Sequence, residues 1–139
     1  MVIEGYASRF ARADLNDDMV AKGAFARSLA RSGAQGVRML YQHQAKSVIG
    51  VWDEVIEDGV GLFVRGRILD AGPEARIVSG LVRAGAIDGL SIGFRTVKSR
   101  KEGRLRVLTE VDLWEVSVVT FPMLTTARIV RIGEEVQAA

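Results

Sequence analysis

The chain has 139 residues, 48% of them hydrophobic, which is enough for a single domain, over residues 1–139, with a sizeable core. It contains no cysteine, so disulfides, thiolate metal sites and cysteine nucleophiles are excluded, and a reducing, cytoplasmic location is expected. The net charge of +2 is near neutral and the longest uncharged apolar stretch, residues 116–127, is shorter than a membrane helix, so neither indicates a nucleic-acid or membrane partner.

The N-terminal quarter predicts a strand followed by a short helix. Residues 2–10 form the strand, and they lack the basic start and sustained apolar run of a secretory signal. A polar loop over residues 13–18 then leads to a helix over residues 24–31. Gly33 follows that helix and can end it in a left-handed conformation.

The next segment predicts three strands and places the only histidine beside one of them. Strands are expected over residues 37–42 and 48–56, joined by a polar linker over residues 44–47. His43 therefore lies at the end of the first of these strands. A third strand, over residues 61–69, turns back to form a hairpin with the one before it.

A second helix is the clearest element of the sequence. Asp70 and Pro73 suit its cap and its first turn, and Gly85 suits its end. Its apolar residues recur at helical spacing and form one stripe, which consists of Ile77, Val78, Leu81 and Val82. We expect both helices to pack outside a sheet or across one of its ends.

The C-terminal part predicts two long strands and sets the expected fold class. Residues 90–95 alternate between apolar and polar, and a strand over residues 105–120 follows a glycine turn. Within it, residues 114–119 are apolar on both faces apart from Glu115 and Ser117. A strand buried on both faces in a mostly antiparallel chain predicts a mixed α+β, mainly β fold, namely a small closed or nearly closed β-barrel with two or more flanking helices.

The first candidates for catalysis are His43 and Ser91. Any mechanism that needs an imidazole base must use His43, because it is the only histidine. Ser91 lies in GLSIG at 89–93, which matches the nucleophile elbow of the α/β-hydrolases in letters but not in context, since here a helix precedes the serine and a strand follows it. The glycines still allow close approach of a substrate. The alternative is that Gly89 completes a turn and Ser91 lies on an outer face.

A third candidate is a carboxylate that would orient the histidine. Glu115 lies between apolar residues, where a carboxylate is costly unless it is paired. Pairing with His43 would fix the imidazole tautomer and stabilise the positive charge that the ring gains as a base. Asp112 could do the same, and a salt bridge from Glu115 to an arginine is the other alternative. The more apolar surroundings favour Glu115 over Asp112.

Other functional classes find less support in the sequence. One histidine and no cysteine leave only carboxylates for a zinc-type site, so neither a metal nor a cofactor is expected. The strip over residues 95–106 holds six basic residues and one acid, and could contact nucleic acid or an acidic scaffold protein. It has no interleaved aromatic residue for base stacking, and such charges also keep an exposed hairpin soluble, so nucleic acid is not the expected partner.

Several short sequence motifs are spread over most of the chain, in a specific order and spacing. They are GYAS at 5–8, GAF at 23–25, LYQH at 40–43, IG at 49–50, GAIDGLSIGF at 85–94 and EVSVVTFP at 115–122. Together they resemble the prohead, or capsid-maturation, serine proteases of tailed phages, including those of gene transfer agents. The resemblance implies a fold similar to the herpesvirus assemblins, a barrel flanked by helices.

The resemblance also implies roles for individual residues. The base of the family falls on His43, its nucleophile on Ser91 and its acidic third member on Glu115. The oxyanion hole should be formed by backbone amides in the loop after the Glu115 strand, for which the candidates are Met123, Leu124 and Thr125. The chain departs from the family pattern at Gln44 and Met123, and both departures could alter substrate fit.

The implied activity is a serine endopeptidase that acts inside an assembling procapsid in the cytoplasm of the host cell. Its expected substrates are a scaffolding segment of the major capsid protein and the protease itself, with no membrane partner. A homo-oligomer is an expectation from the family alone. The alternative function is a catalytically inactive module that supports capsid assembly, or binds nucleic acid or scaffold, through the basic hairpin over residues 95–106.

Overall fold

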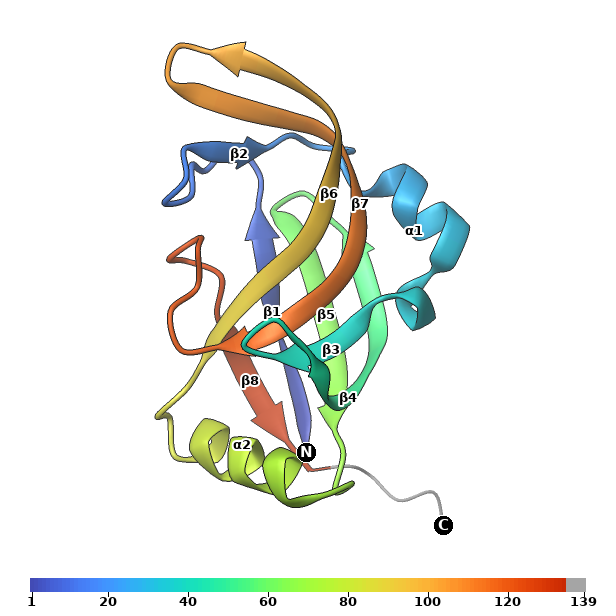
Figure 1. Cartoon of the computed structure of the whole chain (residues 1–139), viewed down its shortest axis with the longest axis vertical. Coiled ribbons are helices and arrows are strands. Elements are labelled where there is room, and N and C mark those ends of the chain that lie inside the picture. The colour runs from blue at the N-terminus through green and yellow to red at the C-terminus, as the bar shows by residue number, and fades with distance from the viewer. Residues whose placement is uncertain (135–139) are drawn as a thin grey trace.

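Eight strands form one curled sheet with two α-helices at its margins (Figure 1). The computed structural model describes residues 1–134. The strands are β1 (Val2–Arg9), β2 (Asp18–Val20), β3 (Arg38–Tyr41), β4 (Gln44–Glu57), β5 (Gly61–Ile68), β6 (Gly89–Glu102), β7 (Leu105–Val119) and β8 (Ile129–Gly133). The helices are α1 (Ala26–Ser32), α2 (Pro73–Arg83) and a short 3₁₀ turn over Ala34–Gly36.

The sheet is a curled half-barrel, so the prediction of a closed or nearly closed barrel is wrong. Its strand order is β2-β7-β3-β4-β5-β1-β8, with β6 paired to β7. β7 runs parallel to β2 and β3, and the other pairs are antiparallel. Closure would require the two end strands to share a hydrogen-bonded ladder, and here β2 pairs with β7 while β8 pairs with β1. The mainly β composition with flanking helices is confirmed.

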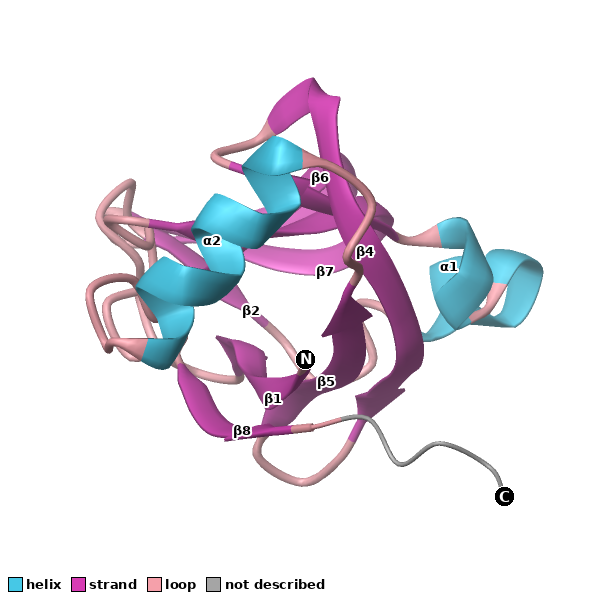
Figure 2. Ribbon diagram, turned by 90° about the horizontal axis from the view of Figure 1, so that it is seen from below, coloured by secondary structure: helices cyan, strands magenta, loops and turns pink. Residues whose placement is uncertain are grey.

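The two helices begin and end close to the predicted positions. Gly33 ends α1 with a φ of 62°, in the left-handed region that glycine adopts readily. Pro73 opens α2 as expected, but the cap position is Gly72 rather than Asp70, whose carboxylate accepts a hydrogen bond from Arg76 at 3.1 Å. Figure 2 shows α2 across one end of the curled sheet and α1 on its outside. No helix within residues 1–134 is long and apolar enough to span a membrane.

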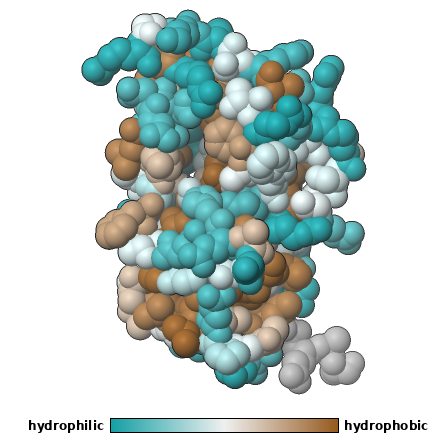
Figure 3. Space-filling model, in the orientation of Figure 1, coloured by the Kyte–Doolittle hydropathy of each residue, from teal (hydrophilic) through white to brown (hydrophobic). Residues whose placement is uncertain are grey.

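β7 is the central strand of the site and of the core. From Val116 to Val119 its side chains are almost completely buried, because β6 lies on one side of it and β3 on the other. The prediction that both faces are buried fails at Trp114, which is 57% exposed. Figure 3 shows hydrophilic side chains gathered at the end of the molecule where the β6–β7 hairpin projects. This projecting part contains the basic strip.

Candidate active site

His43 lies in the turn of a tight hairpin. β3 ends at Tyr41 and β4 begins at Gln44, which pairs with Tyr41, so Gln42 and His43 alone form the connection. Both have positive φ angles, 53° and 59°, as in the type I′ turns that suit the twist of two-residue hairpins. The predicted linker over residues 44–47 is therefore part of a strand. The turn moves His43 off the end of β3 and presents its side chain, 45% exposed, above β7.

Gln42 fastens this turn to the end of β7. Its backbone N–H donates to the carbonyl of Val118 at 3.0 Å. Its side-chain amide donates to the hydroxyl of Thr120 at 2.6 Å and accepts from the Thr120 backbone N–H at 3.2 Å. A non-glycine residue with positive φ carries strain that the surrounding structure must offset. These three hydrogen bonds supply part of that stabilisation and fix the position of the backbone next to His43.

Glu115 is the acid that meets the histidine. The Nδ1–H of His43 donates to Glu115 Oε1 at 2.5 Å, which leaves Nε2 as the nitrogen free to accept a proton. Glu115 is only 8% exposed. Its pairing partner on the neighbouring strand β6 is Gly93, where a Cβ atom would lie 2.3 Å from Glu115 Oε1. A glycine at position 93 therefore creates the space that the carboxylate occupies.

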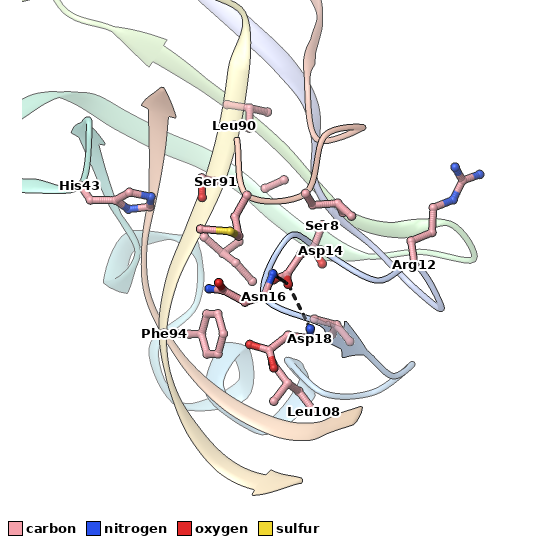
Figure 4. Close-up of a pocket in the computed structure, with 15 residues that line it drawn as sticks. Ser8, Arg12, Asp14, Asn16, Asp18, His43, Leu90, Ser91, Phe94 and Leu108 are labelled. Atoms are coloured by element: carbon pink, nitrogen blue, oxygen red, sulfur yellow. Dashed lines mark hydrogen bonds between the residues drawn. The ribbon is translucent and has the colours of Figure 1, made fainter. Parts of the chain in front are cut away.

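Ser91 lies on β6 and faces the same pocket as His43. It is 7% exposed and is paired in register with Ser117 of β7. Figure 4 shows the hydroxyl of Ser91 and the ring of His43 pointing toward one another across the pocket. The hydrogen bonds found among residues 1–134 do not include one between these two side chains. Such contacts are commonly looser in unliganded sites and shorten when substrate binds.

Gly89 brings the start of β6 close to the loop that follows β7. A Cβ atom at this position would lie 2.6 Å from the carbonyl oxygen of Val119 and 2.8 Å from the ring of Pro122. Position 89 thus has a packing reason to be glycine, as position 93 does. The two glycines around Ser91 therefore have different partners, the loop after β7 on one side and the Glu115 carboxylate on the other.

The pocket extends from the two catalytic candidates toward β2 and has a volume of about 180 Å³. Its walls are mainly apolar, and the residues that line it include Val20, Leu90, Ile92, Phe94, Leu108 and Leu124. Asp14 and Asp18 form its polar end (Figure 4). Arg106 pairs with both oxygens of Asp18, at 2.8 and 2.9 Å. Burial raises the pKa of Asp14, although its carboxylate accepts backbone N–H groups of Asn16 and Asp18.

The loop between β7 and β8 contains the candidate oxyanion donors. Two of its carbonyls accept hydrogen bonds: Met123 accepts from the backbone N–H of Leu15, in the β1–β2 loop, at 3.0 Å, and Leu124 accepts from that of Ala127 at 2.9 Å. Within the described part of the chain, the amides of Met123, Leu124 and Thr125 donate no hydrogen bond. Met123 and Leu124 line the pocket with Ser91, whereas Thr125 is not among the lining residues.

Asp112, the alternative acid, lies elsewhere on β7. Its carboxylate forms ion pairs with Arg31 and Arg95. These arginines, Arg95 first, lower the pKa of Asp112. The β6–β7 ladder pairs Asp112 with Arg95, away from the turn of His43, and it is Glu115 that bonds to the histidine ring. The structure therefore gives Asp112 an electrostatic role on the surface beside α1.

Ser117 is a residue of the site that the sequence analysis did not assign. Its hydroxyl donates to Glu115 Oε2 at 2.6 Å and accepts from the backbone N–H of His43 at 3.0 Å. The signal was present, because residues two apart on a strand share a face, which places Ser117 beside Glu115. Sequence alone did not reveal that the backbone of the histidine would return to the same hydroxyl.

The hydrogen bond that His43 donates to Glu115 raises the pKa of His43 above the ordinary value of 6.5, while burial acts in the opposite direction. Because only neutral His43 can act as a base, we expect the reaction rate of Ser91 to rise with pH through this raised pKa and then level off. The sign for stability is opposite: the ion pair stabilises the fold fully below about pH 6.5 and loses its effect as pH rises through the folded-state pKa.

The measurement pairs two titrations of the same protein. The ring resonances of the only histidine give its pKa by NMR, and the rate of modification by diisopropyl fluorophosphate gives the kinetic midpoint. The two midpoints should coincide and lie above 6.5. A rate that does not change across the NMR midpoint would contradict the role of His43 as base.

Comparisons with known proteins identify the family of the chain. Residues 1–139 match the family of caudovirus prohead serine proteases, and the chain belongs to that family. Over 126 residues it is 33% identical to the prohead protease of Enterobacteria phage HK97. The aligned segment covers 87% of this chain and 55% of that relative. The chain thus spans about half the length of the curated relative that it matches.

Solved structures share the fold at low sequence identity. The capsid assembly protease of bacteriophage T4 is 16% identical, with a TM-score of 0.68 over 85% of this chain and 80% of that one. The KSHV protease, solved with a hexapeptide phosphonate inhibitor, is 10% identical, with a TM-score of 0.61 over 93% of this chain and 63% of that one. The predicted resemblance to prohead proteases and to herpesvirus proteases is confirmed at the level of family and fold.

Proposed function

We propose that the chain is a serine endopeptidase of capsid maturation in which His43, Ser91 and Glu115 form the catalytic triad. The observation that carries the proposal is the bond from the ring of the only histidine to a buried carboxylate, with that ring pointing toward the hydroxyl of Ser91. This is the arrangement in which an acid sets the tautomer and a neutral imidazole removes the serine proton. Membership of the prohead protease family supports it.

The reaction consists of two acyl transfers. His43 Nε2 takes the proton of the Ser91 hydroxyl as its oxygen attacks the carbonyl carbon of a peptide bond. The C–N bond breaks when the imidazolium gives that proton to the leaving amine, and an ester to Ser91 remains. Water then attacks the ester, giving one proton to His43, and the same proton returns to the Ser91 oxygen as the acid product leaves.

Glu115 and the loop after β7 would stabilise the charges that develop in these steps. The carboxylate faces the imidazolium at 2.5 Å and offsets its positive charge. The unused amides of Met123 and Leu124 line the same pocket as Ser91 and are the proposed donors to the tetrahedral oxyanion. Thr125, outside that lining, is the weaker of the three candidates.

The proposed substrates are polypeptides of the procapsid interior, namely a scaffolding segment of the major capsid protein and the protease chain itself. The family membership of the chain supports this, and so does the name of its relative from phage HK97, a prohead protease. The pocket beside Ser91 has mainly apolar walls, which suit an apolar side chain of a polypeptide substrate. Assembly of this chain into homo-oligomers remains a proposal from the family.

The alternative function, a binding module built on the basic hairpin, has less support. Three of the basic residues in the strip over residues 95–106 are partnered by acids of the same hairpin. They are Arg95 with Asp112, Lys98 with Glu110 and Arg100 with Glu102. Such pairing leaves less free positive charge for nucleic acid or an acidic scaffold than the sequence suggested. The hairpin's charges thus have a local explanation.

The experiment is co-expression with the cognate major capsid protein, followed by intact-mass spectrometry. The unaltered chain should shorten the capsid protein, and Ser91→Ala should leave it at full length. Ser99→Ala, an exposed serine on the same strand, is the matched control and should cleave normally. Full-length capsid protein in every culture would overturn the proposal, and so would cleavage that survives Ser91→Ala.

A further inference from the structure

We infer that Ser117 is a positioning residue of this site, whose hydroxyl holds the backbone of His43 and the carboxylate of Glu115 in the arrangement that the proton transfer requires. The inference rests on the proposed function and extends it to a residue outside the triad. Ser117 is completely buried, and it forms its bonds to Glu115 Oε2 at 2.6 Å and to the amide of His43 at 3.0 Å.

The hydrogen-bond inventory fixes the direction of both contacts. A hydroxyl has one proton to donate and two lone pairs that accept. The backbone amide of His43 can only donate, so Ser117 accepts from it, and its own proton is then available for the ionised carboxylate of Glu115. Both directions are satisfied at once, and the hydroxyl has no freedom to rotate without losing one of them. A hydrogen bond to an ionised acceptor is among the stronger kinds.

The geometry makes Ser117 the point where base and acid are aligned. Oε2 of Glu115 is held by Ser117, which directs Oε1 at Nδ1 of His43. The same hydroxyl holds the main chain of His43 in its left-handed conformation, with φ of 59°. The ring of His43 is therefore held by Glu115 and its backbone by Ser117, and both of these residues belong to β7. Loss of the hydroxyl would free both ends of this connection.

Ser117 is also the residue opposite Ser91 in the β6–β7 ladder, yet it cannot serve as a second nucleophile. Its side chain has no contact with solvent, and its proton is committed to Glu115 rather than to an imidazole nitrogen. The structure thus separates the two neighbouring hydroxyls by role. Ser91 faces the pocket and the ring, and Ser117 faces the carboxylate behind the ring.

The test compares Ser117→Ala with Ser28→Ala. Ser28 is a matched control, since it is 5% exposed and its hydroxyl accepts the backbone N–H of Leu113 at 2.9 Å, away from His43. Both variants lose a buried hydroxyl that accepts an amide, so both should lower the melting temperature. Only Ser117→Ala should bring the pKa of His43 down toward 6.5, seen by NMR of this single histidine. It should also slow modification by diisopropyl fluorophosphate about 100-fold, as expected for a misplaced base.

Three results would overturn the inference. An unchanged His43 pKa and reaction rate in Ser117→Ala would reduce the residue to a structural role. A rise in the His43 pKa would show that Ser117 acts through the charge of Glu115 and not through position. Equal effects of both variants would mean that general loss of stability is the cause. If Ser117→Ala does not fold, Ser117→Cys keeps the shape with a weaker donor, and the same three readings apply to it.

The readouts separate this inference from the proposed function. The NMR titration of His43 needs no substrate, so it tests positioning even if the unaltered chain cleaves no capsid protein. Failure of the unaltered chain to react with diisopropyl fluorophosphate would count against the proposed function alone. A normal reaction together with an unmoved pKa in Ser117→Ala would count against the positioning role alone.

Discussion

Replacing Glu115 with glutamine should slow cleavage by about 10⁴-fold at neutral pH, the size of effect known when an orienting acid of a triad becomes an amide. The physical reason is the charge on Oε1, which holds the Nδ1 proton of His43 and stabilises the imidazolium that forms during attack. The variant should also lower the pKa of His43, because the hydrogen bond that His43 donates to the Glu115 carboxylate is the main cause of its rise. Cleavage kinetics and the NMR titration measure the two effects.

Asp112→Asn is the control for this variant, since it removes a carboxylate from the same strand. Asp112 pairs with Arg31 and Arg95 near the surface, where water and salt screen ion pairs and leave them a small contribution to stability. We expect cleavage within about twofold of the unaltered chain and an unchanged His43 pKa. If Asp112→Asn were the slower of the two variants, Asp112 would replace Glu115 as the proposed third member.

Gly93→Ala should disable the site through crowding alone. The new methyl group would lie 2.3 Å from Glu115 Oε1 and 2.7 Å from its Cδ, so the carboxylate must move. Because Oε1 is the atom that meets His43, a shift of about 1 Å should cost about 100-fold in kcat. We expect KM to change much less, since the methyl group lies behind the pocket. Steady-state kinetics on the capsid substrate measures the split.

Gly80→Ala is the matched glycine control. A Cβ atom at Gly80, in α2, would meet nothing within 4 Å, and alanine favours helices by about 1 kcal/mol over glycine. This variant should be neutral or slightly stabilising and should cleave normally. Gly93→Ala with activity within threefold of the unaltered chain would show that the carboxylate has room to move without losing its bond to His43.

The sequence predicted the participants of the site better than their surroundings. His43 could be chosen because no other imidazole exists in the chain, and Ser91 because glycines flank it in a pattern shared with a known family. Glu115 was chosen for two apolar neighbours, and one of them, Trp114, is largely exposed. The burial of Glu115 comes instead from Gly93 and the curl of β6 over β7, which no local pattern encodes.

Sequence reasoning failed where long-range pairing decided the local structure. Residues 44–47 are polar and looked like a linker, but the pairing of Gln44 and Val48 with β3 makes them the start of β4. β2 was missed because its three residues are too few to show alternation, and β8 because its sequence, IVRIG, does not alternate. The failure to predict the half-barrel has the same cause. The strands at its two ends, β2 and β8, were not predicted, so their pairing partners could not be predicted either.

The order of the site along the chain has a consequence for biosynthesis. β3, which carries the turn with His43, pairs in parallel with β7, so this ladder joins segments from the first and last thirds of the molecule. Such distant pairing must wait until both segments exist, and it forms slowly because a long intervening loop must close. On the ribosome, Ser91 emerges before Glu115, the proposed acid of the triad. With the triad proposed above, a nascent chain would therefore lack peptidase activity until β7 has been released.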